Sequence, residues 1–369
     1  MIIQIAFLCI SCLRAMNTAN NYFQQKYPDP TVPTFVKKER PSNLWTRGVY
    51  FEGLMALIQI DPQPRNVQYV QRWADFHRWT PRNGILTRDA DDYCCAQTYI
   101  DLTLWQHQQQ GLPLDKAQLE PTRRCMQHLM AQPDALHDWT WIDAIQMGLP
   151  VLTRLAAIEH EHPEQAAAYS EQGWRMYTWT RDTLAGGLFN REEGLWWRDK
   201  DFVPPYKEPN GRNCYWSRGN GWVYAALVRA MESDPAHHYD DYRADFLRMS
   251  QALLKCQRKD HFWNVSLHDP SNYGGKELTG TALFVYGMAW GVRHGLLPRD
   301  TYLPVVNKTW RAMVRHCLRR DGFLHHVQGT GKEPKDGQPV GKNREPDFDD
   351  FGLGCFLMAG SEIYQLHQP

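Results

Sequence analysis

Gly194-Leu-Trp-Trp197 is one of five short aromatic stretches that recur along this chain of 369 residues, between pairs of helix-periodic segments. The markers of the five stretches, at positions 84, 136, 195, 262 and 323, are separated by 52, 59, 67 and 61 residues. Similar spacing at this length is typical of a repeat architecture with one supersecondary unit per repeat. The other four stretches are Gly84-Ile-Leu-Thr, Ala135-Leu-His-Asp-Trp, His261-Phe-Trp-Asn-Val and Gly322-Phe-Leu-His-His.

Between these stretches the spacing of apolar residues predicts helices, and alternation typical of β-strands is almost absent. Six helical hairpins are too few for a long solenoid and the right number to close a ring. The sequence therefore predicts an all-α fold, an (α/α)6 barrel or six-hairpin toroid. The twelve predicted helices span 14–27, 44–60, 65–79, 92–109, 115–131, 142–159, 163–183, 218–232, 239–257, 278–295, 299–318 and 350–366.

The helices divide into two kinds, as a ring within a ring requires. Some carry many charges and one apolar stripe, which is typical of outer helices with one solvated face. Others are apolar nearly all round and rich in Gly and Ala, so we expect them to form the inner ring. The charged kind includes 65–79, 115–131 and 239–257; the apolar kind includes 44–60, 142–159, 218–232, 278–295 and 350–366.

Polar and aromatic residues gather at the N-termini of the predicted inner helices. If these helices are parallel, all six N-termini meet at one mouth of the barrel, where one cluster alone would be read as a helix cap. The residues are Trp45 and Arg47; Asp91 and Asp92; Asp143; Arg218 and Trp222; Lys276, Glu277 and Thr279; and Asp347, Asp349 and Asp350.

Asp143 and Asp92 are the candidate catalytic acids. They begin adjacent inner helices, and two nearby carboxyl groups split in pKa so that one is protonated while the other is ionised. That arrangement suits general acid and base catalysis on a sugar. The alternative is two independent helix caps, and the choice between Asp91 and Asp92 is open at this point.

Arg218 lies in the second strong motif, Tyr215-Trp-Ser-Arg-Gly-Asn-Gly-Trp222. Its planar guanidinium suits a carboxylate or vicinal hydroxyl groups, although it could instead pair with one of the acids. Aromatic side chains in connections offer faces on which sugar rings stack. The further candidates for substrate contact are Trp216, Trp222, Trp141, Trp45 and His137.

Composition excludes several classes of function. Lys+Arg and Asp+Glu are both 41, so no global field would attract nucleic acid or an anionic membrane. Phosphate loops, dinucleotide fingerprints and zinc spacings do not occur, and 347–350 lacks the spacing of an EF-hand loop. We expect no cofactor or metal, and the aromatic residues in the connections favour an oligosaccharide as the partner. The sequence makes no prediction of the oligomeric state.

The first residues resemble the apolar part of a short signal peptide, although basic residues do not precede them and no clean cleavage site follows. The apolar run is too short to span a bilayer. We expect residues 1–13 to be a signal-like segment and 14–369 to be one catalytic barrel domain. A periplasmic or secreted location is favoured, and a cytoplasmic one is open.

The assembled motifs resemble the unsaturated rhamnogalacturonyl hydrolases of glycoside hydrolase family 105 and, more distantly, the unsaturated glucuronyl hydrolases of family 88. The resemblance covers roughly 40–366 and rests on Trp141-Ile-Asp143 with Met147-Gly148-x-Pro150, on Trp216-Ser-Arg-Gly-Asn-Gly-Trp222, and on 277–286. It implies a metal-free (α/α)6 barrel that hydrates the 4,5-double bond of an unsaturated uronic acid and thereby expels the remaining saccharide. Asp143 would be the proton donor and would activate water, the Asp91/Asp92 position would assist, and Arg218 and Trp222 would bind the uronate.

One segment departs from the family pattern, because Arg198 stands in Leu195-Trp-Trp-Arg-Asp199 where these enzymes often carry a histidine. Arg198 is thus a further candidate for substrate contact, and unsaturated disaccharides other than those of rhamnogalacturonan, such as those from ulvan or glycosaminoglycan-like chains, stay open. The alternatives are an inverting glycosidase, a sugar epimerase and a carbohydrate-binding protein without activity.

Overall fold

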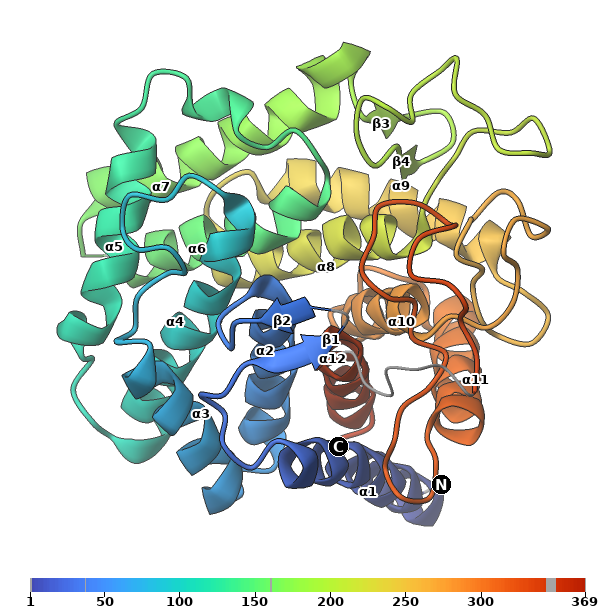
Figure 1. Ribbon diagram of the computed structural model, residues 1–369, viewed down its shortest axis with the longest axis horizontal. Coiled ribbons are helices and arrows are strands. Elements are labelled where there is room, and N and C mark those ends of the chain that lie inside the picture. Colours follow the sequence, from blue (N-terminus) through green and yellow to red (C-terminus); the bar gives the residue numbers. More distant parts are fainter. Residues whose placement is uncertain (1, 37, 160, 343–349, 369) are drawn as a thin grey trace.

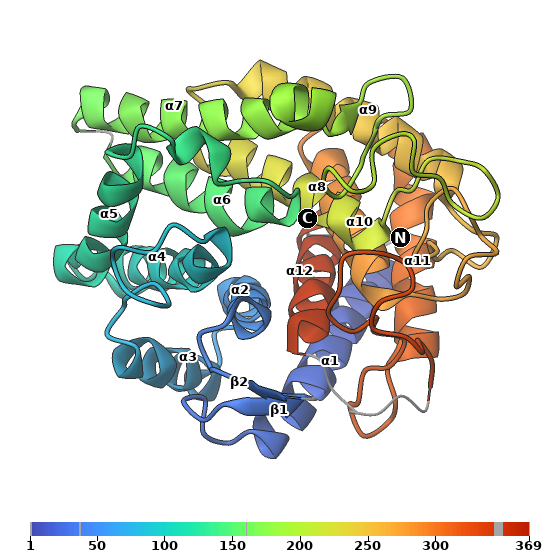
Figure 2. The same cartoon turned by 45° about the horizontal axis from the view of Figure 1, so that its top comes forward.

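The computed structural model describes residues 2–36, 38–159, 161–342 and 350–368 (Figure 1). Six of its helices form a closed inner ring, in which each helix packs against the next and the last packs against the first (Figure 2). In ring order they are α2 (Trp45–Ile60), α4 (Ala90–Gln110), α6 (Asp143–Ile158), α8 (Ser217–Ser233), α10 (Leu278–Arg293) and α12 (Asp350–Leu366).

The remaining α-helices of the described residues surround this ring, and each packs on the inner helix of its own hairpin. An outer helix buries one stripe only. In α3 the buried positions include Tyr69, Val70, Trp73 and Ala74, which recur at helical spacing. The outer helices are α1 (Ile2–Lys26), α3 (Pro64–Phe76), α5 (Lys116–Met130), α7 (Pro163–Thr178), α9 (Tyr239–Cys256) and α11 (Arg299–Cys317).

The ring closes where α2 and α12 touch through glycine. A Cβ atom on Gly53 would lie 2.4 Å from the carbonyl oxygen of Gly354, so only glycine allows the two backbones to approach so closely. This contact explains why these helices are rich in small residues.

Strands are few and short in the described residues. β1 (Thr34–Val36) and β2 (Lys38–Arg40) form an antiparallel hairpin before α2, with Phe35 opposite Glu39. β3 (Phe189–Asn190) and β4 (Leu195–Trp196) form a second hairpin within the aromatic stretch that precedes α8. Short helical turns complete the connections: η1 (Ala135–His137), η2 (Trp179–Thr183) and η3 (Leu184–Gly186).

The structure confirms the predicted (α/α)6 barrel and each of the twelve predicted helices. The predicted start of the first helix was wrong: α1 begins at Ile2, and the expected boundary between residues 13 and 14 lies inside it. Cys12 and Met16 of this helix are fully buried against the barrel. None of the described helices combines the length and hydropathy that a membrane crossing requires.

Candidate active site

The N-terminal ends of the inner helices meet at one mouth, as expected. Arg47 of α2 forms a buried ion pair with Asp350 of α12, with Nε and Oδ2 3.1 Å apart. The indole rings of Trp45, in α2, and Trp222, in α8 on the opposite side of the barrel, pack in a T-shaped arrangement with their centroids 6.3 Å apart. Side chains from opposite inner helices therefore touch below the mouth. Asp347 and Asp349 lie outside the described residues.

Asp143 is the first residue of α6, but it is not the cap of that helix. The N-cap residue is Ile142, and no side chain caps the helix. The carboxylate of Asp143 instead accepts a hydrogen bond from Nε of Arg198 at 3.1 Å. With 9% of its surface exposed, Asp143 lies at the positive end of a helix dipole, where negative charge is stabilised. The capping alternative is thereby removed for this residue.

Asp92 is occupied by its own connection. Its buried carboxylate accepts hydrogen bonds from Nη1 of Arg82 at 2.7 Å, Nδ2 of Asn83 at 3.0 Å and Oγ1 of Thr87 at 2.5 Å. These three partners come from the loop that leads into α4. Asp92 therefore organises this loop, and its oxygens are not available to a substrate.

Asp91 is the carboxyl group that interacts with Asp143. Burial raises the pKa of Asp91 to about 7, helped by repulsion from Asp89 and then Asp143 and opposed by attraction to Arg198. Near neutral pH this acid is divided between its protonated and ionised forms. Of the two acids left open by the sequence, Asp91 is thus the one with a raised pKa, and the catalytic roles of Asp143 and Asp92 stay predictions.

Arg198 is bound by two carboxylates. Nε pairs with Asp143, and Nη1 donates to Oδ2 of Asp199 at 2.8 Å. The main chain holds the same segment, because Ile142 N donates to the carbonyl of Arg198 at 3.0 Å and Trp141 pairs with Asp199 as a β-bridge. Burial lowers the pKa of Arg198, but Asp143 and Asp199 outweigh burial and raise it, so the guanidinium is charged.

Arg218 holds a loop in this structure. Its two terminal nitrogens donate to the carbonyl oxygens of Gln328 and Gly329, both at 2.7 Å. The guanidinium lies between the rings of Trp216, at 4.6 Å, and Phe351, at 4.9 Å. Only 1% of Arg218 is exposed. Arg218 therefore supports segment 328–329, and its contact with substrate stays a prediction.

The predicted aromatic contacts divide by burial. Trp216 and Trp222 are 1% and 0% exposed, so neither ring offers a face to a sugar here, and both form the wall beneath the mouth. Trp45 and Trp141 are partly exposed at the start of α2 and just before α6. His137 is exposed in η1, where its ring lies 5.1 Å from that of Trp179.

Asp199 and Gln328 are the site features that the sequence did not single out, and Asp91 was named only as the alternative to Asp92. Asp199 was visible only as the neighbour of Arg198. Gln328 accepts a hydrogen bond from Nε1 of Trp216 at 2.9 Å and belongs to a connection without periodicity. In the described part of the chain, no group of three or more His, Cys, Asp or Glu side chains could hold a metal ion.

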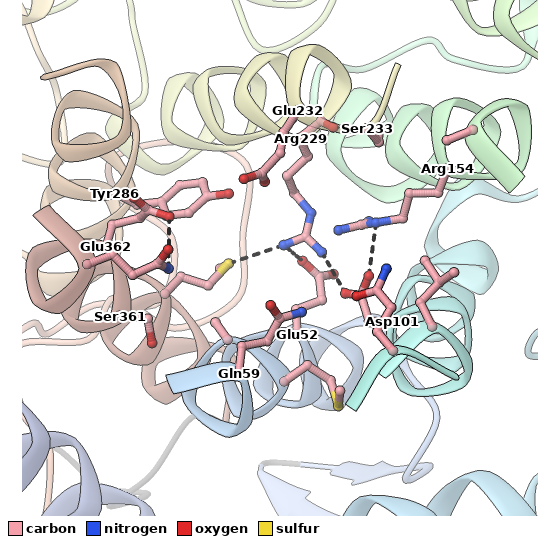
Figure 3. Close-up of a pocket in the computed structure, with 17 residues that line it drawn as sticks. Glu52, Gln59, Asp101, Arg154, Arg229, Glu232, Ser233, Tyr286, Ser361 and Glu362 are labelled. Carbon is pink, nitrogen blue, oxygen red and sulfur yellow. Dashed lines mark hydrogen bonds and ion pairs between the residues drawn. The ribbon is translucent and has the colours of Figure 1, made fainter. Parts of the chain in front are cut away.

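A second polar region lies at the other end of the ring, among the C-terminal halves of the inner helices (Figure 3). It is a cavity of about 380 Å³ lined by charged side chains. Arg229 lies 3.4 Å from Glu52 and 3.3 Å from Asp101, and Arg154 lies 3.0 Å from Asp101. These ion pairs bind the acids and arginines of the network to one another. Burial raises the pKa of Glu362, which also lines the cavity, to about 7.

Six helical hairpins in a ring, with carboxyl groups from adjacent inner helices at the mouth, define a glycosidase of the six-hairpin class. The sequence model of Glycosyl Hydrolase Family 88 matches residues 15–367. The chain belongs to this family.

Individual relatives agree with this assignment. The chain is 30% identical over 343 residues to an unsaturated 3S-rhamnoglycuronyl hydrolase of Formosa agariphila, covering 88% of this chain and 85% of that protein. The solved structure of a family 88 glycosyl hydrolase from Bacteroides vulgatus superposes with a TM-score of 0.84 at 29% identity, covering 97% and 99% of the two chains. A family 105 structure from C. acetobutylicum gives 0.69 at 17% identity, over 95% and 99%, and supports the fold alone.

Proposed function

We propose that this enzyme releases a 4,5-unsaturated uronic acid from the non-reducing end of oligosaccharides produced by polysaccharide lyases. The observation that carries the proposal is the Asp91–Asp143 pair, in which electrostatic repulsion from Asp143 helps to keep Asp91 partly protonated near neutral pH. The name of the Formosa agariphila relative, unsaturated 3S-rhamnoglycuronyl hydrolase, supports the same class of substrate.

The reaction is hydration of an enol ether. Asp143 donates a proton to C4 of the double bond, and the positive charge that develops at C5 is stabilised by the ring oxygen. Water then adds at C5 and returns its proton to Asp143. The resulting hemiketal opens and expels the saccharide at C1. Asp91, the partly protonated neighbour, supplies the proton that Asp143 passes to C4, and it regains a proton when Asp143 hands on the one taken from water.

The names of the relatives also point to the identity of the leaving sugar. We infer that the preferred substrate carries the unsaturated uronate on rhamnose, because two relatives, 30% and 28% identical to this chain, bear the name unsaturated 3S-rhamnoglycuronyl hydrolase. Disaccharides from rhamnogalacturonan and from glycosaminoglycans are the comparison substrates.

The test offers this panel of unsaturated disaccharides to the full chain and follows the ultraviolet absorbance of the alkene. Only hydration consumes the double bond, so an ordinary glycosidase would release sugar with the absorbance unchanged. We expect Asp143→Asn to bind the substrate and to lose turnover by a factor of about 10² or more. A variant with near wild-type turnover would refute the assignment of Asp143.

A further inference from the structure

We propose that Arg198 binds the carboxylate of the substrate and that Asp199 is the positioning residue that keeps one nitrogen of Arg198 open for it. This inference rests on the proposed function, because it names the group that recognises the charged end of the unsaturated sugar.

The other arginines of the mouth are already committed. Arg218 is 1% exposed and donates to two main-chain carbonyls. Arg47 is equally buried and pairs with Asp350, and Arg82 holds Asp92. Arg198 differs from these three arginines because it contacts Asp143 and 19% of its side chain is exposed.

Two of the three guanidinium nitrogens of Arg198 are used by the protein. Nε faces Asp143 at 3.1 Å, and Nη1 faces Asp199 at 2.8 Å. Within the described residues, Nη2 has no hydrogen-bond partner, although it carries two N–H donors. A charge-assisted hydrogen bond to a carboxylate is the strongest contact that such a donor offers.

The chemistry of the substrate fits this position. In a 4,5-unsaturated uronate the carboxylate is attached directly to C5, which is joined to C4 by the double bond. Nη2 and Nε are bonded to the same carbon of Arg198. A carboxylate on Nη2 therefore brings C4 and C5 close to the oxygen of Asp143 that Nε already holds. Recognition and proton transfer are coupled through one side chain.

Asp199 keeps the guanidinium in this orientation. Its own carboxylate is fixed, because Oδ1 accepts the main-chain N–H of Asp201 at 2.9 Å while Oδ2 holds Nη1. Without the charge of Asp199, Arg198 is free to turn and to bind Asp143 through Nε and Nη2 together, the bidentate geometry that carboxylates favour. That pairing would consume the nitrogen that the substrate needs.

The experiment measures binding without turnover, by titrating the full-length protein with D-glucuronate and with its neutral amide, D-glucuronamide, in saturation-transfer NMR. Wild type should prefer the acid about tenfold, the value of one hydrogen bond between charged groups. Arg198→Gln should abolish this preference, and Asp199→Asn should reduce it several-fold. Asp201→Asn is the matched control, because it removes an acid two residues away that pairs with Lys332 at the surface.

Each outcome decides the proposal. A general structural defect in a variant would weaken the binding of both ligands and leave the ratio of the two affinities unchanged. A wild type without preference for the acid, a preference retained by Arg198→Gln, or an equal loss in Asp201→Asn and Asp199→Asn would overturn it. If Arg198→Gln does not fold, Arg198→Lys, which keeps the charge and loses the fork, should lower the preference instead. Should no disaccharide lose its alkene absorbance while the acid preference persists, the proposed function fails and the Arg198 site stands.

Discussion

Asp91 and Asp92 are neighbours in the chain, but their carboxyl groups have different surroundings. In an α-helix successive side chains point about 100° apart, so two adjacent residues cannot both face the barrel axis. Asp92 turns toward its loop and is bound by Arg82, Asn83 and Thr87. Asp91 is left largely buried and close to Asp89 and Asp143, and burial, helped by these two charges, raises its pKa to about 7.

Asp91→Asn should stabilise the protein at alkaline pH and remove most of its activity. The pKa of Asp91 is about 7 in the folded protein and about 3.9 in an unfolded chain. The folded state therefore binds the proton more tightly, and the free energy of unfolding falls as pH rises between these values. Urea unfolding should show Asp91→Asn more stable than wild type by up to about 4 kcal/mol at pH 8, with the difference nearly absent at pH 4.

The same substitution should lower turnover about 10²-fold, because asparagine cannot supply a proton. In wild type the rate should decline as pH rises through about 7, where Asp91 loses its proton. A stability difference that is equal at both pH values would contradict the assignment of the raised pKa to Asp91.

Asp92→Asn should have the opposite balance of effects. The substitution weakens a buried, charge-assisted contact with Arg82 and disturbs the loop that leads into α4. We expect a loss of about 2 kcal/mol in the free energy of unfolding at neutral pH, and less loss of turnover than in Asp91→Asn. Parallel assays of the two variants test this, and the reverse order of activity would restore Asp92 as the second acid.

The sequence predicted which helix N-termini carry the candidate site residues, but not the direction in which each side chain points. Asp143 could be predicted because a lone acid there follows a tryptophan-rich loop. The choice of Asp92 over Asp91 could not be made, since the phase of α4 depends on where its cap falls. Asp89 supplies that cap by accepting the N–H of Asp91 at 3.0 Å. The burial of Arg218 depends equally on long-range contacts, with carbonyls 110 residues or more away.

At the scale of elements, apolar periodicity located the helices because inner helices are buried nearly all round, while each outer helix buries one stripe along its length. The start of α1 was misjudged for a physical reason. The apolar composition of residues 2–12 suits both a signal-like segment and the first turns of a helix, so composition alone does not fix where α1 begins. Met16 of α1 packs against Gly360 of α12, where an added Cβ would lie 2.6 Å from its sulfur.

The α2–α12 contact predicts a sharp response to a single methyl group. In Gly53→Ala the new Cβ would meet the carbonyl oxygen of Gly354 at 2.4 Å, and a backbone atom cannot move aside as a flexible side chain does. We expect the free energy of unfolding to fall by about 3 kcal/mol or more in urea titration. Gly341→Ala is the control, because nothing lies within 4 Å of its added Cβ. Equal stability of the two variants would show that α2 and α12 separate easily.

At the scale of the whole molecule, the barrel places different electrostatics at its two ends. The N-terminal mouth holds the split acid pair and a charged arginine. The opposite end holds a network of Glu52, Asp101, Arg154 and Arg229, one residue from each of α2, α4, α6 and α8 (Figure 3). The residue types of this network were visible in the sequence, but their mutual pairing follows from closure of the ring.

This network predicts a stability change that depends on pH. Burial raises the pKa of Glu52, and Arg229 is the first of the groups that lower it again. Arg229→Met leaves Glu52 as a buried carboxylate without its guanidinium, which should cost about 3 kcal/mol at pH 8. Because the pKa of Glu52 in the folded state then rises further, the unfolded state releases the proton first, and the loss should shrink as pH falls toward 5.

The double variant Glu52→Gln/Arg229→Met separates charge from packing. If the cost of Arg229→Met arises from the unpaired carboxylate, the added Glu52→Gln change should recover much of it at pH 8 and little at pH 5, as measured by urea unfolding. Recovery that is the same at both pH values would assign the cost to lost packing around the methionine instead. The network lies at the opposite end of the ring from Asp143. Every folded variant of this set should therefore keep the wild-type preference for D-glucuronate over D-glucuronamide.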